Sequence, residues 1–430
     1  MNPRYSVIVP NLNGRAFLET CFASLEACRY PAEQVEWLLV DNASVDDSVD
    51  LVQRRFPRAR IVQLTDNQGF AGAINAGVEE ARGEYLVFLN NDMRVSEDWL
   101  AGFDAVLDPA HPCASGLIRS GDGQRVDFLE GLLLFEGGAL QRADGVALNK
   151  VRLESNPTFI ACGGNMAIRR ELYERLGGFD PGFFAYGEDV DLSWRLHAAG
   201  HGIVFAPGAA VNHYRQGTSD RLGEARREFL YKRNAFATLF KNIDEPLFAA
   251  FLQIAWLTMI HRTREIIRLK APGAEALDEH LGELALPPPG APGSPATWLA
   301  RLDALGRLGA RRGWRAALSR ALIRLGEGLA PAPPPRGELP SPDLSHPLVH
   351  AQLQLIWAIT GGLDDLLARR RMVQARRTVP DRRLFERFPP WVVPVYPGDQ
   401  ALFDSDAFRA LLPPTVAFRH ASLDEVHAPP

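Results

Sequence analysis

The chain is poor in the features that mark several classes of protein. It has four cysteines among 430 residues, and their spacing fits neither a metal site nor a disulfide framework: Cys21, Cys28, Cys113 and Cys162. Its first residues enter a strand-like pattern directly, without the basic and apolar regions of a secretory signal. These absences predict a protein of a reducing cytoplasm.

Long apolar runs and a strong net charge are also missing. The longest apolar run, residues 247–260, is shorter than the roughly 20 residues that span a bilayer, so we expect a buried helix there, with contact at the membrane surface as the alternative. The formal net charge of -5 offers no overall attraction to nucleic acid or to anionic membranes. With 46% hydrophobic and 23% charged residues, the composition is typical of a globular protein with a sizeable core.

The first 240 residues alternate strand-like and helix-like segments. Short apolar runs end in turn-forming residues at 5–10, 35–41, 59–64 and 84–89, and segments of helical period lie between them at 15–28, 44–56 and 70–82. Continuous apolar strands separated by helices predict a parallel sheet with both faces covered. We therefore predict an α/β domain over residues 1–240.

Polar side chains follow each predicted strand at the point where it ends. They are Asn11, then Asp41 with Asn42, then Asn67, and finally the run from Asn90 to Asp92. In parallel sheets, ligands gather at the carboxyl ends of the strands. The pattern therefore predicts a polar binding site at one edge of the sheet.

The character of the chain changes after about residue 240. Helical stretches are interrupted by two proline-rich segments, 287–295 and 331–347, which we expect to be linkers. Seven arginines lie on a helical pattern between them, and a further basic segment covers 368–377. These charges indicate solvated helix faces or, alternatively, docking to anionic lipid at the inner face of the plasma membrane. We predict a mainly helical C-terminal region over 241–430.

Five segments in a fixed order carry a resemblance to a known family: "VIVPNLNGRAFLETCFASL", "LLVDNASVDDSV", "DNQGFAGAINAG", "LNNDM" and "YGEDVDLSWRLHAAG". The chain resembles the family 2 glycosyltransferases, in detail the bacterial rhamnosyltransferase-like branch, over residues 5–235. The resemblance implies the GT-A fold, with a Rossmann-like, mostly parallel sheet. It also implies inverting transfer of a sugar from a UDP- or dTDP-linked donor to a glycan or lipid-linked acceptor in cell-surface polysaccharide synthesis.

The resemblance assigns the donor site to the sheet edge. It implies that Asp41 accepts a hydrogen bond from the nucleotide base, with Pro10 and Asn11 lining that pocket. It also places Asn67 and Gly69 near the nucleotide. A helix N-cap is the alternative role for Asp41.

The resemblance assigns a metal site as well. Asn90, Asn91 and Asp92 occupy the Asp-x-Asp position of the family, which implies that Asp92 binds Mg²⁺ or Mn²⁺ and that the metal takes up charge on the diphosphate. Asn90 replaces the first aspartate and can still hydrogen-bond a ribose. His213 is implied as a second ligand, with a surface histidine as the alternative.

The catalytic residues implied by the resemblance lie in the last of the five segments. Asp189 is the expected general base, and Glu188 is expected to orient the acceptor, although acids at a helix start also serve as caps. Trp194 either stacks on an acceptor sugar or belongs to the core. Cys162 has no evident base partner and is excluded as a nucleophile.

Two other classes of function compete with this interpretation. A nucleotidyltransferase would show a glycine-rich and basic phosphate loop near the amino terminus, where the sequence offers only Arg15. A non-catalytic scaffold or glycan-binding protein is disfavoured by the intact Glu188–Asp189 pair. Nucleic-acid binding is not expected, because few aromatic residues interleave with the arginines.

Overall fold

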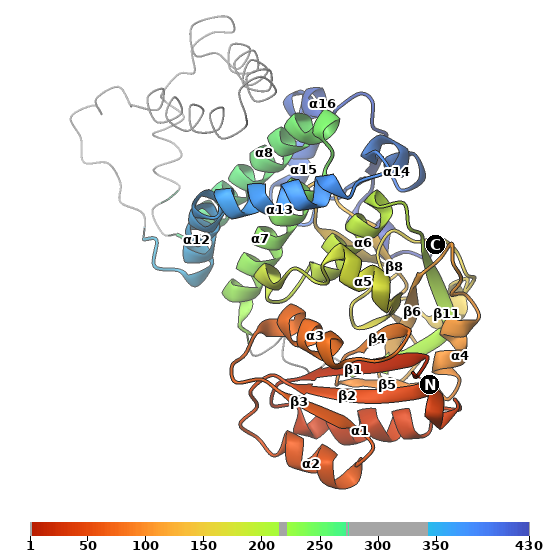
Figure 1. Cartoon of the computed structure of the whole chain (residues 1–430). Helices are drawn as coiled ribbons and strands as arrows, with labels where there is room; N and C mark the ends of the chain where they lie inside the picture. The colour runs from red at the N-terminus through yellow and green to blue at the C-terminus, as the bar shows by residue number, and fades with distance from the viewer. Residues whose placement is uncertain (1, 215–221, 272–273, 275–342, 430) are drawn as a thin grey trace, which may run out of the picture. The chain divides into compact units, whose positions relative to one another are not determined.

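The structure is a computed structural model that describes residues 2–214, 222–271, 274 and 343–429 (Figure 1). The chain divides into two compact units, Met1–Arg262 with Ala351–Pro430, and Thr263–His350. The boundary expected at residue 240 does not coincide with this division. Three predicted features lie outside the described residues: the linker at 287–295, most of the linker at 331–347, and the arginine pattern between them.

The first half of the sheet is parallel, as predicted. It contains β1 (Tyr5–Asn11), β2 (Val35–Asp41), β3 (Arg60–Gln63) and β4 (Tyr85–Leu89). The helices α1 (Arg15–Glu26), α2 (Ser48–Arg55) and α3 (Gly69–Glu80) connect these strands, with a 3-10 turn η1 (Ala32–Gln34). Asn11 pairs with Asp41 across the first two strands, so the polar residues that end these strands meet at one edge.

The second half of the sheet is mixed. It adds β5 (Met93–Val95), β6 (Cys113–Ser120), β7 (Val126–Phe128), β10 (Asn165–Arg169) and β11 (Ile203–His213). Within the described residues the strand order is β3-β2-β1-β4-β10-β6-β11-β5, with β7 beside β6. β10 runs antiparallel to both neighbours, whereas β11 is parallel to β6 and antiparallel to β5. The sheet is therefore less uniformly parallel than the sequence pattern indicates.

Alternation of side chains along the strands builds a core on each face of the sheet. Val7 and Val9 point to one face, where α1, α2 and α4 (Trp99–Asp104) pack, and Ile8 points to the other. The opposite face is covered by α3, α5 (Arg170–Leu176) and α6 (Glu188–Ala198) (Figure 1). Asn11, Asn42 and Asn90, at the carboxyl ends of β1, β2 and β4, line a cavity there.

The remaining elements lie between β7 and β10, before α6, and after β11 in the chain. A hairpin of β8 (Glu130–Leu133) and β9 (Ala139–Arg142) precedes η2 (Leu148–Lys150), and η3 (Pro181–Phe183) precedes α6. Beyond β11 lie α7 (Glu224–Asn242), α8 (Glu245–Lys270), α12 (Pro347–Gly361), α13 (Leu363–Ala375), α14 (Asp381–Arg387), β12 (Trp391–Val392), α15 (Asp399–Asp404), α16 (Asp406–Leu411), β13 (Arg419–His420) and α17 (Leu423–His427). This confirms the predicted helical C-terminal region where the structure describes it.

The apolar run at 247–260 lies within α8, as expected. Its residues Phe248, Phe251 and Ile254 are buried, so the run serves as a core helix. Among the residues that the structure describes, no helix combines the length and apolar character needed to cross a bilayer.

The basic segment 368–377 has a role that the sequence did not indicate. Arg370 Nη1 donates to the carbonyls of Phe240 and Ile243, and Gln374 Nε2 donates to that of Asn242. The last carbonyls of a helix have no partner within the helix, so these side chains cap the end of α7. Arg370 is therefore neither on a solvated face nor available to lipid.

Candidate active site

A cavity of about 990 Å³ opens at the polar edge of the sheet. Ten residues predicted for the site line it: Pro10, Asn11, Asn67, Gly69, Asn90, Asn91, Asp92, Glu188, Asp189 and His213. The sequence therefore identified residues that the fold brings together from both halves of the sheet. Two further predicted residues, Asp41 and Trp194, lie outside the lining.

The amides at the ends of β1 and β4 form a hydrogen-bonded chain. Asn91 Nδ2 donates to Asn11 Oδ1 at 2.7 Å, and Asn11 Nδ2 donates to Asp41 Oδ1 at 3.3 Å. A Cβ on Gly14 would lie 2.2 Å from Asn91 Nδ2, so glycine is needed for the chain to pack. Asp41 is buried behind Asn11 and also accepts from the backbone N–H of Ser44 at 3.1 Å. This is a local turn contact and not the helix N-cap named as the alternative, because α2 begins only at Ser48. The contact of Asp41 with a nucleotide base remains a prediction.

A second amide cluster holds the loop before α3. Asn42 Nδ2 donates to Asn67 Oδ1 and to the carbonyl of Gly69, both at 3.0 Å, and Asn42 Oδ1 accepts from the N–H of Gln68. Asn42 also lines the cavity, and the sequence pattern had included it among the polar residues at the predicted sheet edge without giving it a specific role. The sequence signal for Asn42 was its position directly after Asp41, at the end of a predicted strand.

The end of β11 brings a histidine to the acidic residue after β4. His213 pairs with Met93 across β11 and β5, and the N–H of Tyr214 donates to the carbonyl of Asp92. His213 Nε2 consequently lies 3.2 Å from Asp92 Oδ2. On its other side, His213 Nδ1 lies 2.9 Å from Asp127 Oδ2. Burial alone would lower the pKa of His213, but the bonds to Asp127 and Asp92 raise it to about 9.

This arrangement fits a divalent cation. Carboxylate oxygen and imidazole nitrogen are both metal ligands, and a carboxylate on the second imidazole nitrogen is the usual support of a ligating histidine. Asp127 supplies that support for His213. The residues that the structure describes contain no group of three or more His, Cys, Asp or Glu side chains placed to hold a metal.

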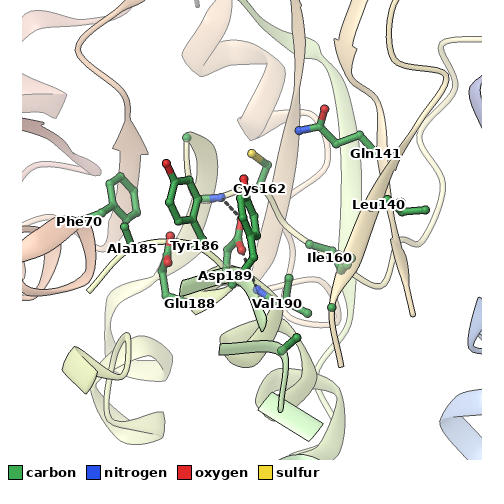
Figure 2. Close-up of a pocket in the computed structure, with 18 of the residues that line it drawn as sticks. Phe70, Leu140, Gln141, Ile160, Cys162, Ala185, Tyr186, Glu188, Asp189 and Val190 are labelled. Carbon is green, nitrogen blue, oxygen red and sulfur yellow. Dashed lines mark hydrogen bonds between the residues drawn. The ribbon is translucent and has the colours of Figure 1, made fainter. Parts of the chain in front are cut away.

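Two carboxylates face the same cavity from the start of α6. Asp189 Oδ2 accepts from the N–H of Gly163 at 3.0 Å, and Asp189 Oδ1 accepts from that of Val190 at 2.8 Å. Burial raises the pKa of Asp189. Burial together with the charge of Asp189 raises the pKa of Glu188 to about 8, and within the described part of the chain Glu188 Oε2 has no hydrogen-bond partner. Figure 2 shows Phe70 on one side of Asp189 and Leu140 on the other.

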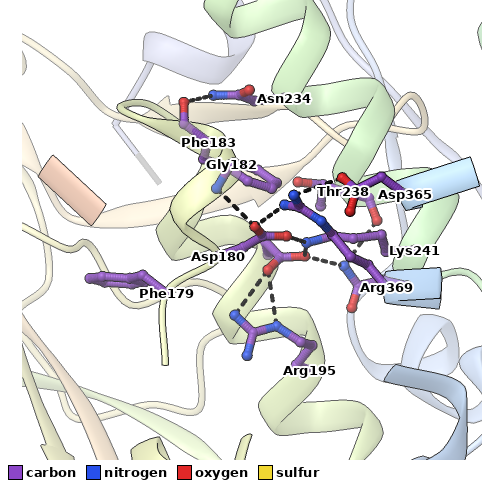
Figure 3. Close-up of polar contacts among 12 residues, drawn as sticks. Phe179, Asp180, Gly182, Phe183, Arg195, Asn234, Thr238, Lys241, Asp365 and Arg369 are labelled. Atoms are coloured by element: carbon purple, nitrogen blue, oxygen red, sulfur yellow. Dashed lines mark hydrogen bonds and ion pairs between the residues drawn. The ribbon is translucent and has the colours of Figure 1, made fainter. Parts of the chain in front are cut away.

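The third acid of α6 has a structural role instead. Asp191 is fully buried and lies 2.9 Å from Lys241 Nζ and from Arg195 Nη2. Lys241 Nζ also lies 2.5 Å from Asp180 Oδ2, which contacts Arg369 of α13 as well (Figure 3). This network ties α6 to α7 and α13, so the C-terminal helices hold the helix that carries Asp189.

The loop that leads into α6 is strained and firmly held. Phe184, Tyr186 and Gly187 have positive φ angles of 66°, 70° and 80°, which non-glycine residues adopt at a cost. Asn234 Nδ2 of α7 donates at 2.6–3.0 Å to three carbonyls of this loop, those of Phe183, Ala185 and Tyr186. The loop is also close to the donor side, since a Cβ on Gly69 would lie 2.2 Å from the carbonyl oxygen of Phe184.

Trp194 lies outside the lining of the cavity, whereas Cys162 is part of it. The indole of Trp194 is 1% exposed, packs on Phe385 and donates to Asp381 Oδ1 at 2.8 Å. The structure thus places Trp194 in the core, which was the alternative to acceptor stacking. Cys162 lines the cavity, but burial raises the pKa of its thiol, which agrees with its exclusion as a nucleophile.

Comparisons with known proteins match the first half of the chain. The profile of glycosyl transferase family 2 matches residues 6–177, and that of the N-terminal domain of galactosyltransferase matches residues 145–217. The O-antigen biosynthesis protein RfbC of Myxococcus xanthus is 30% identical over 52% of this chain and 18% of its own length. The glycosyltransferase AglE of Haloferax volcanii is 26% identical over 47% of this chain and 64% of its own length. The chain thus spans less than two thirds of either relative.

A third relative is covered more fully. The N-acetylglucosaminyl-diphospho-decaprenol L-rhamnosyltransferase of Mycobacterium tuberculosis is 30% identical over 47% of this chain and 74% of its own length. Among solved structures, the mannosyltransferase PcManGT from Pyrobaculum calidifontis, in complex with GDP-Man and Mn²⁺, is 22% identical with a TM-score of 0.43. That comparison covers 85% of this chain and 88% of the other.

Proposed function

The chain belongs to glycosyl transferase family 2, and on that premise we propose that it transfers a sugar with inversion from a nucleotide-sugar donor to an acceptor hydroxyl in the cavity that Asp92 and Asp189 share. Its mixed sheet with a helical C-terminal region is the GT-A fold expected of the family. The observation that carries the proposal is that the Asp92–His213 pair and Asp189 line one cavity, although they come from distant parts of the sequence.

In this proposal the polar edge of the sheet holds the donor. The nucleotide lies against Pro10, Asn11, Asn67 and Gly69, and the amides of Asn90 and Asn91 are available to the ribose. The buried Asp41 fixes Asn11 through their hydrogen bond. We propose a UDP- or dTDP-sugar as the donor.

Asp92 and His213 would hold a divalent metal against the diphosphate. The bound cation would stabilise the charge that develops on the leaving group. Because Mg²⁺ prefers ligand sets made of oxygen alone, the imidazole favours Mn²⁺. Asp127 accepts a hydrogen bond from Nδ1 of His213, which would leave the Nε2 atom of His213 to bind the metal.

Asp189 acts as the general base. It takes the proton of the acceptor hydroxyl as that oxygen bonds to the anomeric carbon, while the bond from the same carbon to the diphosphate oxygen breaks. Attack from the face opposite the leaving group inverts the anomeric centre. The burial that raises the pKa of Asp189 makes it a stronger base than an exposed aspartate. General-base assistance of this kind contributes about 10²–10⁴-fold to a rate.

The acceptor is proposed to be a glycan or a lipid-linked sugar used in bacterial cell-surface polysaccharide synthesis. The names of two relatives, an O-antigen biosynthesis protein and a rhamnosyltransferase acting on a diphospho-decaprenol, support this class. We propose that Glu188, which lies beside Asp189 in the lining of the cavity, orients the acceptor hydroxyl.

A screen of sugar nucleotides tests the metal-assisted reaction. The purified protein should release nucleotide from at least one UDP- or dTDP-sugar when Mn²⁺ is present. Asp92→Asn keeps the shape of the side chain but removes its charge, so it should abolish the Mn²⁺-dependent turnover. Asp50→Asn makes the same change on the exposed face of α2 and serves as the control. Undiminished Mn²⁺-dependent turnover in Asp92→Asn would refute the metal assignment.

A further inference from the structure

The chain from Trp391 to His427 lies far beyond residue 217, where the matched family profiles end, yet it borders the cavity. We call this stretch the C-terminal strap. It belongs to the same compact unit as the catalytic residues, and three of its residues line the cavity: Val395, Tyr396 and His427. We propose that the strap holds the β8–β9 hairpin against the loop 160–163 and thereby positions the general base Asp189. This inference rests on the proposed transferase function, because it concerns the base of that reaction.

The β8–β9 hairpin forms a two-stranded sheet of its own, separate from the main sheet. A hairpin of two strands is marginally stable in water unless another element covers its apolar side. Leu132 and Leu140 pair across the two strands, so their side chains point to the same face. Together with Leu134, they pack on the buried Val393 and Val426 of the strap. The strap therefore supplies the cover that the hairpin needs.

The strap also bonds to the main chain of the hairpin near the end of each strand. The N–H of Phe135, two residues after β8, donates to the carbonyl of Trp391 at 3.0 Å. The N–H of Ala143, directly after β9, donates to the carbonyl of Val426 at 3.0 Å. The ring of Phe135 meets two aromatic rings of the strap edge-on, each at a centroid distance of 5.6 Å: Phe403 and Phe408. These contacts fix where the hairpin lies as well as stabilising it.

A tyrosine fixes the strap itself to the helices α7 and α8. Tyr396 Oη donates to Glu228 Oε2 of α7 at 3.0 Å. The ring centroid of Tyr396 lies 4.3 Å from Lys232 Nζ and 4.5 Å from the guanidinium carbon of Arg262. Arg262 Nη2 also lies 2.9 Å from Oδ2 of the buried Asp399 in the strap. Because these helices hold the strap, it can act as a fixed support for the hairpin.

The opposite face of the hairpin packs on the loop 160–163. Side chains alternate along a strand, so Gly131 faces away from the side that carries Leu132. A Cβ on Gly131 would lie 2.8 Å from Cβ of Ile160, so glycine lets the hairpin and this loop pack closely. In the view of Figure 2, Ile160 lies between Leu140 and Asp189. The hairpin therefore lies between the strap and the loop.

The loop 160–163 is in turn bonded to the helix that carries the base. The N–H of Ala161 donates to Ser193 Oγ of α6 at 3.1 Å, and the N–H of Gly163 donates to Asp189 Oδ2 at 3.0 Å. The second bond orients the carboxylate of Asp189 and favours its charged form. A hairpin that loses its support would loosen this loop and weaken the bond from Gly163.

Hydrogen exchange of the full-length chain tests whether the strap acts on the loop. Val426→Ala shrinks a buried member of the cluster between strap and hairpin, and Val416→Ala makes the same change at a buried strap position outside that cluster. In Val426→Ala we expect exchange to accelerate by at least about tenfold in peptides that cover 130–142 and 160–163, whereas Val416→Ala should exchange there as the wild type does. Faster exchange in the hairpin alone, or in neither peptide, would overturn the proposal.

A milder variant keeps the test decisive if Val426→Ala folds poorly. Leu423→Ala acts on a partly buried residue of the same cluster, and the same two peptides should exchange faster.

Kinetics separate positioning of the base from a general loss of stability. Under conditions in which Val426→Ala stays folded, nucleotide release with Mn²⁺ should show kcat lowered by about 3- to 10-fold and a donor KM within about twofold of the wild type. Because the N–H of Gly163 lowers the pKa of Asp189, a weaker bond should also move the acid limb of the kcat profile to higher pH. An unchanged kcat and an unchanged acid limb, measured beside Val416→Ala, would show that the strap does not position the base.

The two measurements also separate this inference from the proposed function. Hydrogen exchange requires no donor, so a wild type that releases no nucleotide would contradict the transferase mechanism and leave exchange to decide whether the strap holds the loop. Turnover by the wild type, combined with wild-type exchange and wild-type kcat in Val426→Ala, would overturn the role of the strap alone.

Discussion

Replacing Lys241 with methionine should destabilise the fold at neutral pH and much less in acid. The Lys241 side chain is 2% exposed and lies 2.5 Å from Asp180 Oδ2 and 2.9 Å from Asp191 Oδ1. Methionine keeps the length and the apolar stem but removes the charge. Asp191 would keep Arg195, and Asp180 would keep Arg369, so neither carboxylate is left without a cation.

The expected magnitude follows from this partial compensation. Breaking a buried ion pair costs about 3–5 kcal/mol when the remaining charge has no partner. Since each acid retains one cation here, we expect the free energy of unfolding to fall by about 2–3 kcal/mol at pH 7. Lys150→Met removes the same charge at an exposed position and should change it by less than about 0.5 kcal/mol.

The pH dependence distinguishes an ion pair from lost packing. Burial alone would raise the pKa of Asp191, but Lys241 and Arg195 hold it below its ordinary value. A depressed carboxyl pKa contributes stability above the ordinary value of about 3.9 and loses it as the pH falls through the folded value. Urea unfolding followed by circular dichroism should therefore show a smaller difference between wild type and Lys241→Met below about pH 4. An equal difference at both pH values would refute the electrostatic explanation.

Three further predictions concern the catalytic side of the cavity. Asn234→Ala removes the donor to three carbonyls of the loop before α6 and should lower kcat, measured as nucleotide release, by at least about tenfold. Asn212→Ala removes an amide outside this loop and should leave kcat unchanged. The raised pKa of Glu188 means that the folded state resists ionisation of this carboxyl, so the free energy of unfolding of the wild type should fall as the pH rises from ~4.3 to about 8. Glu188→Gln cannot ionise and should not show this fall. Urea unfolding measures both proteins, and parallel pH profiles of the free energy of unfolding would contradict the prediction. Asp127→Asn should weaken Mn²⁺ binding by about 10–100-fold in a direct titration, and unchanged affinity would show that Asp127 does not support His213.

The first half of the fold was readable from the sequence because its signals are local. The strands β1, β2 and β4 are apolar runs that end in amides or carboxylates, so their direction and their polar edge follow from the pattern. Asn11, Asn91 and Asp92 could be placed together because parallel strands end at the same edge. The start of α6 carried an equally local signal in Glu188 and Asp189.

The parts that escaped prediction depend on contacts between distant segments. Asp127 lies in a stretch without a motif, and only the pairing of β7 with β6 brings it to His213. Asn234 resembles any polar residue of a helix, yet it holds a strained loop 48–51 positions away. Trp194 could have faced either a ligand or the core, and the choice was made by Asp381, 187 residues later in the chain. No periodicity or spacing reports such pairings.

The proposed mechanism makes its clearest claim about Asp189, and one substitution separates binding from chemistry there. Asp189→Asn keeps the size of the side chain and can still accept from the N–H of Gly163, but its amide cannot take a proton. Isothermal titration of the nucleotide-sugar found by the screen, together with its transfer rate, measures both properties on the same preparation. We predict donor affinity close to that of the wild type and a transfer rate lower by about 10²–10⁴-fold. Transfer at the wild-type rate by Asp189→Asn would contradict the account.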